Sequence, residues 1–244
     1  MKKISLLMLM FLSGCASRGR DPDNQSVDAD AYYRLAFTAR KSGNSQVAIN
    51  FLEKIKNASK PEYQILLAEC YLDTHNVSLV KKILQKLEAQ ELDTAHMKQV
   101  NYLRGKLLIL EGKKDEAIEI LKNISTPEAY NALGVMYDKK GEYQMAQQSY
   151  KKAMELDHSQ IDAYHNFGVS AILEGDYEKA IVYLEKAVCM PDASISQRST
   201  LGFAYVMAGK EKEARDIYRH DYTEDKVDSY IASIKKMKKQ PQSL

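Results

Sequence analysis

Small and large apolar residues recur along this chain with a period of 34 residues. Each period begins with an apolar residue followed by glycine, and a second glycine, an alanine and a tyrosine or leucine follow at constant distances. Mostly polar residues separate them, so each period predicts two amphipathic helices joined by a short turn. The recurring positions are Leu133-Gly134, Phe167-Gly168 and Leu201-Gly202, then Gly141, Gly175 and Gly209, then Ala146, Ala180 and Ala214, and finally Tyr150, Leu184 and Tyr218.

These residue types suit the close packing of two antiparallel helices. The first glycine is expected where the two helices of one repeat cross, because a larger side chain would hold them apart. The second glycine is expected in the turn, where a positive φ is easiest without a Cβ atom. The pattern resembles the tetratricopeptide repeat (TPR). It therefore predicts an all-α fold, a right-handed superhelical solenoid of stacked helical hairpins.

The same frame continues towards the N-terminus with less regular spacing. It predicts six repeats within residues 29–222, beginning near residues 29, 61, 98, 127, 161 and 195. In the second repeat His75-Asn76 replaces the turn glycine, and asparagine accepts the left-handed conformation better than most residues. The upstream positions are Leu35, Ala36, Gly43, Ala48 and Leu52, then Leu67, Ala68, Tyr71, Val80 and Leu84, then Gly105, Gly112, Ala117 and Leu121.

One more amphipathic helix is expected after the sixth repeat, from Thr223 to Lys238, within a C-terminal segment of residues 223–244. Val227, Tyr230, Ile231 and Ile234 share one side of it, and lysines occupy the other. Because the last layer of a solenoid exposes apolar side chains, we interpret this helix as a cap with one polar face. The alternative is a basic amphipathic helix that lies on a membrane.

The N-terminus has the layout of a secretory signal peptide in residues 1–14, with Lys2 and Lys3 before a short apolar run. That run is too short to span a bilayer. Leu12-Ser13-Gly14-Cys15 resembles the lipobox of bacterial lipoproteins, which implies cleavage before Cys15 and acylation of its thiol and amine, with palmitate among the acyl chains. The alternative is an ordinary signal peptide with an incidental cysteine.

Residues 15–28 then follow as the lipidated cysteine and a flexible tether, because this polar stretch lacks an apolar period. Lipoproteins that stay at the inner membrane usually carry Asp after the cysteine, whereas this chain has Ala16. The resemblance therefore implies a lipid anchor in the outer membrane, on its periplasmic face.

Charge and cysteine content exclude several functions. The formal net charge is +2 and about zero without Lys2 and Lys3, so we expect no nucleic-acid partner. Cys70 and Cys189 lie far apart in the predicted array, which favours two unpaired, buried thiols over a disulfide. The five histidines are scattered without metal-ligand spacing, and no catalytic motif is present. We therefore expect neither an enzyme nor a cofactor.

A solenoid usually binds its partners on the concave face, which the first helix of each repeat lines. In the fifth and sixth repeats this face carries an apolar strip, which would suit an apolar helix or an extended peptide. The alternative is that the C-terminal helix or closure of the superhelix covers the strip. The candidate binding residues are Val169, Ile172, Leu173, Phe203, Val206 and Met207, together with Tyr102 and Ile109 of the third repeat.

The first repeats have a mixed concave face. Tyr33, Phe37, Arg40 and Lys41 are expected there in the first repeat. Glu62, Ile65, Glu69, Leu72 and Asp73 are expected there in the second. The spaced Lys, Asn and Arg set of TPR domains that grip a C-terminal carboxylate cannot be placed on these positions. We therefore do not expect a carboxylate clamp.

A lipobox, a short tether, six TPR units and a terminal helix resemble the TadD-type lipoproteins of tight-adherence (Flp) pilus assembly. Asn131-Ala132-Leu133-Gly134-Val135 and Ser199-Thr200-Leu201-Gly202-Phe203-Ala204 carry the resemblance best. It implies a scaffold for pilus biogenesis that binds the outer-membrane secretin and other assembly components, and helps the secretin localise or assemble. Two alternatives are a TPR pilotin of type IV pili and a periplasmic adaptor that docks peptidoglycan hydrolases or proteases.

Overall fold

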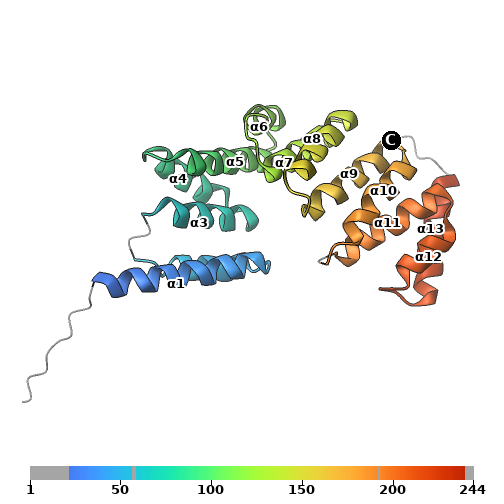
Figure 1. Ribbon diagram of the computed structural model, residues 1–244, viewed down its shortest axis with the longest axis horizontal. Helices are drawn as coiled ribbons and strands as arrows, with labels where there is room; N and C mark the ends of the chain where they lie inside the picture. The colour runs from blue at the N-terminus through green and yellow to red at the C-terminus, as the bar shows by residue number, and fades with distance from the viewer. Residues whose placement is uncertain (1–21, 57–58, 192, 240–244) are drawn as a thin grey trace, which may run out of the picture.

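The computed structural model describes residues 22–56, 59–191 and 193–239. Within these ranges the chain forms thirteen helices and no strand, which confirms the predicted all-α solenoid. Helices pair as antiparallel hairpins that stack in a curved array from α1 to α13 (Figure 1). The helices are α1 Pro22–Lys41, α2 Ser45–Leu52, α3 Pro61–Asp73, α4 Val77–Glu88, α5 Thr94–Leu110, α6 Lys114–Leu121, α7 Pro127–Asp138, α8 Tyr143–Leu156, α9 Ile161–Glu174, α10 Tyr177–Val188, α11 Ile195–Ala208, α12 Glu211–Tyr218 and α13 Glu224–Lys239.

Four of the six hairpins begin at the expected residues, and two begin earlier. Helix α5 begins at Thr94 because the Asp93 carboxylate accepts a hydrogen bond from the His96 amide at 2.8 Å, which caps the helix. Helix α1 begins at Pro22, so residues 22–28 are helical where a flexible tether was expected. A proline suits a first turn, since its fixed φ is helical and its missing N–H would have no partner there.

The small residues lie where the helices of a hairpin cross, as predicted. A Cβ atom added to Gly168 would lie 2.4 Å from Cγ of Leu184, and one on Gly202 would lie 2.4 Å from the Tyr218 ring. Carbon atoms essentially never approach so closely without a bond, so any larger residue would separate the helices. Ala36 and Ala68 take this position in the first two hairpins, and both are fully buried.

The turns within five hairpins contain a glycine with positive φ, namely Gly43, Gly112, Gly141, Gly175 and Gly209. In the second hairpin His75 adopts this conformation, with φ of 57°. Asn76, which is the better residue for it, instead has φ of −87° and caps α4 by accepting a hydrogen bond from the Leu79 amide. The expectation that asparagine would take the left-handed position is therefore wrong.

The C-terminal helix α13 packs on α11 in the place that the first helix of a further repeat would occupy. Val227, Ile231 and Ile234 are its buried residues. An ion pair holds the turn before it: Arg198 of α11 donates to both oxygens of Asp221, at 2.6 and 2.7 Å. Among the described helices, none has the length and apolar character that crossing a bilayer requires.

Candidate functional site

The sixth-repeat half of the predicted apolar strip lies under α13. Val206 is 3% exposed, and Phe203 and Met207 are half-buried in the same cluster as Val227 and Ile231. Val206 is therefore a core residue, and its assignment to an open groove is wrong. The structure favours the alternative for this half of the strip, in which the C-terminal helix covers the apolar side chains.

The fifth-repeat half remains accessible between α7 and α9. Val169 and Leu173 line a shallow pocket of about 330 Å³, which we call the α7–α9 pocket. Leu173 is 53% exposed at its rim, whereas Ile172 packs against the core cluster of α9, α10 and α11. The pocket also includes Val135, which the sequence analysis did not assign. Val135 lies one period before Val169, so the 34-residue repeat could have assigned it to the same face.

A half-buried carboxylate lines the α7–α9 pocket and joins three helices. Asp138 of α7 accepts hydrogen bonds from the Tyr150 hydroxyl of α8 at 2.7 Å and the Ser170 hydroxyl of α9 at 2.6 Å. Burial raises the pKa of Asp138, while the two hydrogen bonds act in the opposite direction. This polar junction fixes α9 against the preceding hairpin and so sets the shape of the pocket.

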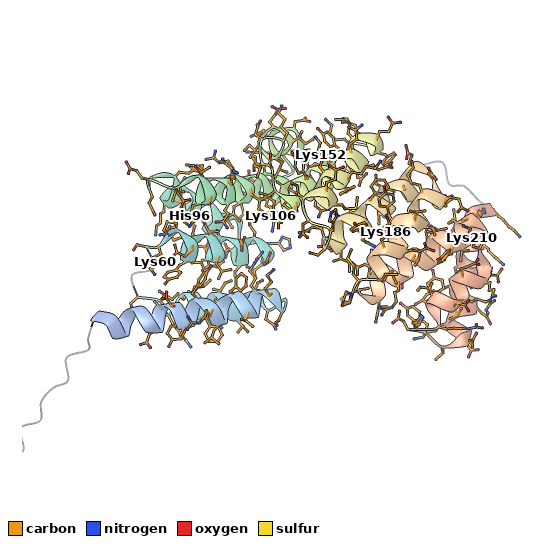
Figure 2. The ribbon with its side chains drawn as sticks, in the orientation of Figure 1. Lys60, His96, Lys106, Lys152, Lys186 and Lys210 are labelled. Carbon is orange, nitrogen blue, oxygen red and sulfur yellow. The ribbon has the colours of Figure 1, made fainter. Side chains whose placement is uncertain are left out.

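A second open volume, about 570 Å³, is lined by residues of the first three hairpins and of the start of the fourth. We call it the α1–α5 groove. Figure 2 shows side chains of α1, α3 and α5 in the spaces between these helices, and Lys106 lies towards the end of α5. Tyr102 lines it, as expected for a binding residue. Ile109 does not line it, and packs against the hydrophobic cluster of α6 and α7 instead. The groove is lined by Tyr33, Phe37, Arg40, Lys41, Glu62, Ile65, Leu66, Glu69, Ala95, Lys98, Gln99, Tyr102, Lys106, Thr126 and Glu128.

Charged residues cross-link the C-terminal ends of the helices in this groove. Arg40 of α1 forms ion pairs with Glu69 and Asp73 of α3, both at 2.9 Å. The Lys106 ammonium lies 3.9 Å from an Asp73 oxygen and 5.9 Å from the centre of the Tyr102 ring. The groove is therefore both aromatic and charged, in contrast to the apolar α7–α9 pocket.

The two cysteines of the array are unpaired, and only one is buried. Burial raises the pKa of the Cys70 thiol to about 12, which makes it a poor nucleophile. Cys189 is exposed, contrary to the expectation that both would be buried. The predicted lipidation residue, Cys15, lies outside the described residues. In the described part of the chain no cluster of three or more His, Cys, Asp or Glu residues could hold a metal ion.

Comparisons with known proteins support the TPR assignment. Tetratricopeptide-repeat family models match residues 29–60, 127–160 and 161–188. No curated protein matches the sequence. The fold is thus assigned from the repeats and from solved structures.

Two solved structures share the arrangement over most of the chain. PilW, a widely conserved type IV pilus biogenesis factor, is similar with a TM-score of 0.64 and 13% identity, over 80% of this chain and 95% of PilW. PilF of Pseudomonas aeruginosa is similar with a TM-score of 0.59 and 18% identity, over 90% of this chain and 95% of PilF. At these identities the likeness shows the fold alone, a solenoid of TPR-like helical hairpins.

Proposed function

We propose that this protein is an outer-membrane lipoprotein that scaffolds pilus assembly by binding a protein component, most specifically the secretin of a tight-adherence (Flp) pilus. Its solenoid would hold the client on the concave face while acylated Cys15 keeps it at the periplasmic side of the membrane. Because the anchor confines scaffold and client to the same surface, their effective concentration would rise and assembly would be favoured.

The single observation that carries this proposal is the likeness to PilW over 80% of the chain. Two features of the chain agree with it. The lipobox-like Leu12-Ser13-Gly14-Cys15 accounts for membrane attachment. The concave face offers an apolar pocket and an aromatic groove, and each has room for side chains of a partner.

Gene deletion and complementation test the two parts of the proposal together. We expect loss of the gene to abolish surface pili and to reduce the detergent-resistant multimers of the secretin. The wild-type gene should restore both, whereas Cys15→Ser should leave the protein in the soluble periplasmic fraction and restore them poorly. Cys189→Ser, which alters an exposed thiol, is the matched control and should behave as wild type.

Affinity purification from detergent-solubilised envelopes identifies the partner. A tight-adherence secretin among the bound proteins supports the proposal, and a type IV pilus secretin favours a pilotin of that system. Recovery of peptidoglycan hydrolases or proteases without a secretin favours the adaptor. Normal pili and normal secretin multimers in the deletion strain would refute a role in pilus assembly.

A further inference from the structure

The two ends of the helical array differ in what their outer layers expose. At the C-terminal end, α13 covers apolar side chains of α11 and α12. At the other end, α1 and α2 contact each other and α3, and no other described helix packs on them (Figure 1). The side of the first hairpin that faces away from α3 is therefore the exposed end of the solenoid.

Contacts with α3 show which sides of α1 and α2 point inwards. On α1 the Tyr33 ring packs on a tyrosine of α3, with ring centres 5.2 Å apart. On α2 the Ser45 hydroxyl donates to the Asp73 carboxylate of α3 at 2.8 Å. Leu35 and Val47 lie two residues beyond these inward positions, which is about 200° around a helix. Both therefore point outwards, and they are 49% and 44% exposed.

An aromatic pair joins the two exposed aliphatic residues into one patch. The Tyr32 ring of α1 and the Phe51 ring of α2 are stacked, with centres 6.3 Å apart. Leu35 lies one turn after this tyrosine, and Val47 lies one turn before the phenylalanine. Because the two helices are antiparallel, both aliphatic side chains lie on the same side of the ring pair, towards the turn that joins the helices. We call Tyr32, Leu35, Val47 and Phe51 the outer α1–α2 patch.

The charged residues around this patch balance one another. Asp28 and Arg34 of α1 and Glu53 of α2 are exposed. Lys54 of α2 lies over both rings of the aromatic pair, at 5.9 and 5.6 Å from their centres. Tyrosine rings and lysine stems are favoured at membrane–water interfaces, where an apolar body meets a polar surface. The patch is therefore suited to an interface that is apolar on one side and carries no strong net charge.

The start of α1 places this hairpin close to the proposed lipid anchor. Residues 16–21 alone separate Cys15 from Pro22, the first residue of α1. A stretch of this length extends over at most about 25 Å, which is less than the roughly 30 Å length of the 20-residue helix α1. The first hairpin is thus the part of the array that the anchor holds nearest to the bilayer.

We propose that the outer α1–α2 patch rests on the phospholipid surface of the membrane, with Leu35 and Val47 inserted at the boundary between headgroups and acyl chains. This inference rests on the proposed function for the acylation of Cys15, and adds the orientation of the array. A patch of this size is too small to bind a bilayer alone, but the anchor raises its concentration at the surface. The second contact would direct the later hairpins, with the α7–α9 pocket, away from the bilayer.

A fluorescent reporter beside the patch tests the proposal in the acylated full chain, reconstituted into phosphatidylcholine vesicles. In a Cys189→Ser background, Asn50→Cys places a labelling site at an exposed position of α2, and Ser233→Cys places the control site on α13. Cys70 is buried and should not react. We expect an environment-sensitive label at residue 50 to shift its emission to the blue and to be quenched by lipids that carry a nitroxide on the acyl chain. The label at residue 233 should emit as in water.

Charged substitutions then show whether the patch makes the contact. Leu35→Asp/Val47→Asp should lower the ratio of docked to free label at residue 50 by about tenfold or more, because two half-exposed aliphatic side chains no longer enter the interface. The matched control Met145→Asp/Val182→Asp changes residues that are 44% and 50% exposed on α8 and α10, and should keep the ratio. Added salt should change the ratio little, since apolar burial and not charge drives the contact.

Folding is checked by circular dichroism and by the melting temperature of both double variants, which should match those of wild type. If the aspartates lower the melting temperature, Leu35→Gln/Val47→Gln repeats the test without added charge. It should also reduce docking.

Three results would overturn the inference. The first is a label at residue 50 that stays in water in the wild-type chain, and the second is equal quenching in both aspartate double variants. The third is a dimer in detergent that Leu35→Asp/Val47→Asp dissociates, because the patch would then bind a second copy.

The outcome is separable from that of the proposed function. Mass spectrometry of the purified chain that shows an unmodified Cys15 would remove the anchor on which both proposals rest. An acylated chain whose label stays in water would remove this inference alone. A docked chain whose deletion strain has normal pili would remove the pilus role alone.

Discussion

Gly134 of α7 lies directly against the ring of Tyr150 of α8, so that a Cβ atom on Gly134 would be 2.4 Å from the ring carbon Cε1. Tyr150 is 1% exposed, and its hydroxyl is fixed by Asp138. The ring therefore cannot rotate away, and the distance between the two helices depends on the absence of a side chain at residue 134.

We expect Gly134→Ala to destabilise the protein by about 2 kcal/mol, because the added methyl group forces α7 and α8 apart in a packed core. Urea unfolding followed by circular dichroism measures the change. Gly112→Ala is the matched control: its Cβ would meet nothing within 4 Å, and only the positive φ of 75° opposes it. Gly112→Ala should lower the free energy of unfolding by about 1 kcal/mol. Equal stability of Gly134→Ala and wild type would contradict the packing described here.

The two halves of the predicted apolar strip should respond differently to charge. Val206→Asp places a carboxylate in the cluster beneath α13 and should cost more than about 3 kcal/mol. Leu173→Asp changes a side chain that is 53% exposed and should alter the stability by less than about 1 kcal/mol. Thermal unfolding measures both. If Leu173 contributes to partner binding, Leu173→Asp should weaken recovery of the partner while the helical content stays unchanged.

The ion pair between Arg198 and Asp221 should make stability depend on pH. The Arg198 guanidinium lowers the pKa of Asp221 below its ordinary value of 3.8 in the folded protein. Between the lowered pKa of the folded state and the ordinary pKa of the unfolded state, the folded protein therefore binds fewer protons than the unfolded protein. The stabilisation by the ion pair is fully present above the ordinary pKa of Asp221, and it is lost as the pH falls through the lowered pKa. We expect Asp221→Asn to have a lower melting temperature than wild type at neutral pH.

The difference in melting temperature between wild type and Asp221→Asn should shrink as the pH is lowered below 3.8. The control is Asp228→Asn, whose carboxylate pairs with Arg215 but is 61% exposed. It should change the melting temperature little at any pH. A difference for Asp221→Asn that stays constant with pH would show that the ion pair does not stabilise the turn before α13.

The turn at His75 should accept a glycine with a gain in stability. His75 has φ of 57°, a conformation that costs a residue with a Cβ atom more than it costs glycine. Part of the gain is offset because glycine increases the entropy of the unfolded chain. We expect His75→Gly to raise the free energy of unfolding by about 0.5 kcal/mol. If chemical denaturation shows that His75→Gly clearly lowers the free energy of unfolding, the His75 imidazole makes a contact that stabilises the protein by more than the positive φ costs.

Much of the fold could be predicted because packing in a repeat depends on side-chain size at fixed positions. The spacing of Gly168 and Gly202 placed both helix crossings correctly, and the turn glycines followed from the same period. The start of helix α1 was not predicted because residues 22–28 are polar and lack an apolar period, so hydrophobic patterning does not mark them as helical. The choice between His75 and Asn76 depends on the exact length of α3, which residue preferences do not determine.

The candidate site was harder to predict because periodicity identifies an apolar face but not the element that covers it. Leu173 and Met207 lie one period apart on the first helices of two repeats, yet Leu173 is 53% exposed whereas Met207 packs in the cluster that includes Val227 and Ile231 of α13. The α1–α5 groove combines residues of four helices, so its balance of charge depends on distances such as that between Arg40 and Glu69. The place of Tyr102 in the repeat predicted that it lies on the concave face, whereas the ion pairs that Arg40 forms with Glu69 and Asp73 could not be predicted from the sequence.

The placement of α13 also limits how copies of this protein can associate. Its outward residues include Ser229, Ser233 and Lys236, all exposed, while its apolar side is already occupied by α11 and α12. A fibre in which one molecule continues the winding of the next needs an uncovered apolar layer at the growing end. Because Ser229, Ser233 and Lys236 are exposed on α13, we do not expect a second copy to continue the winding from this helix.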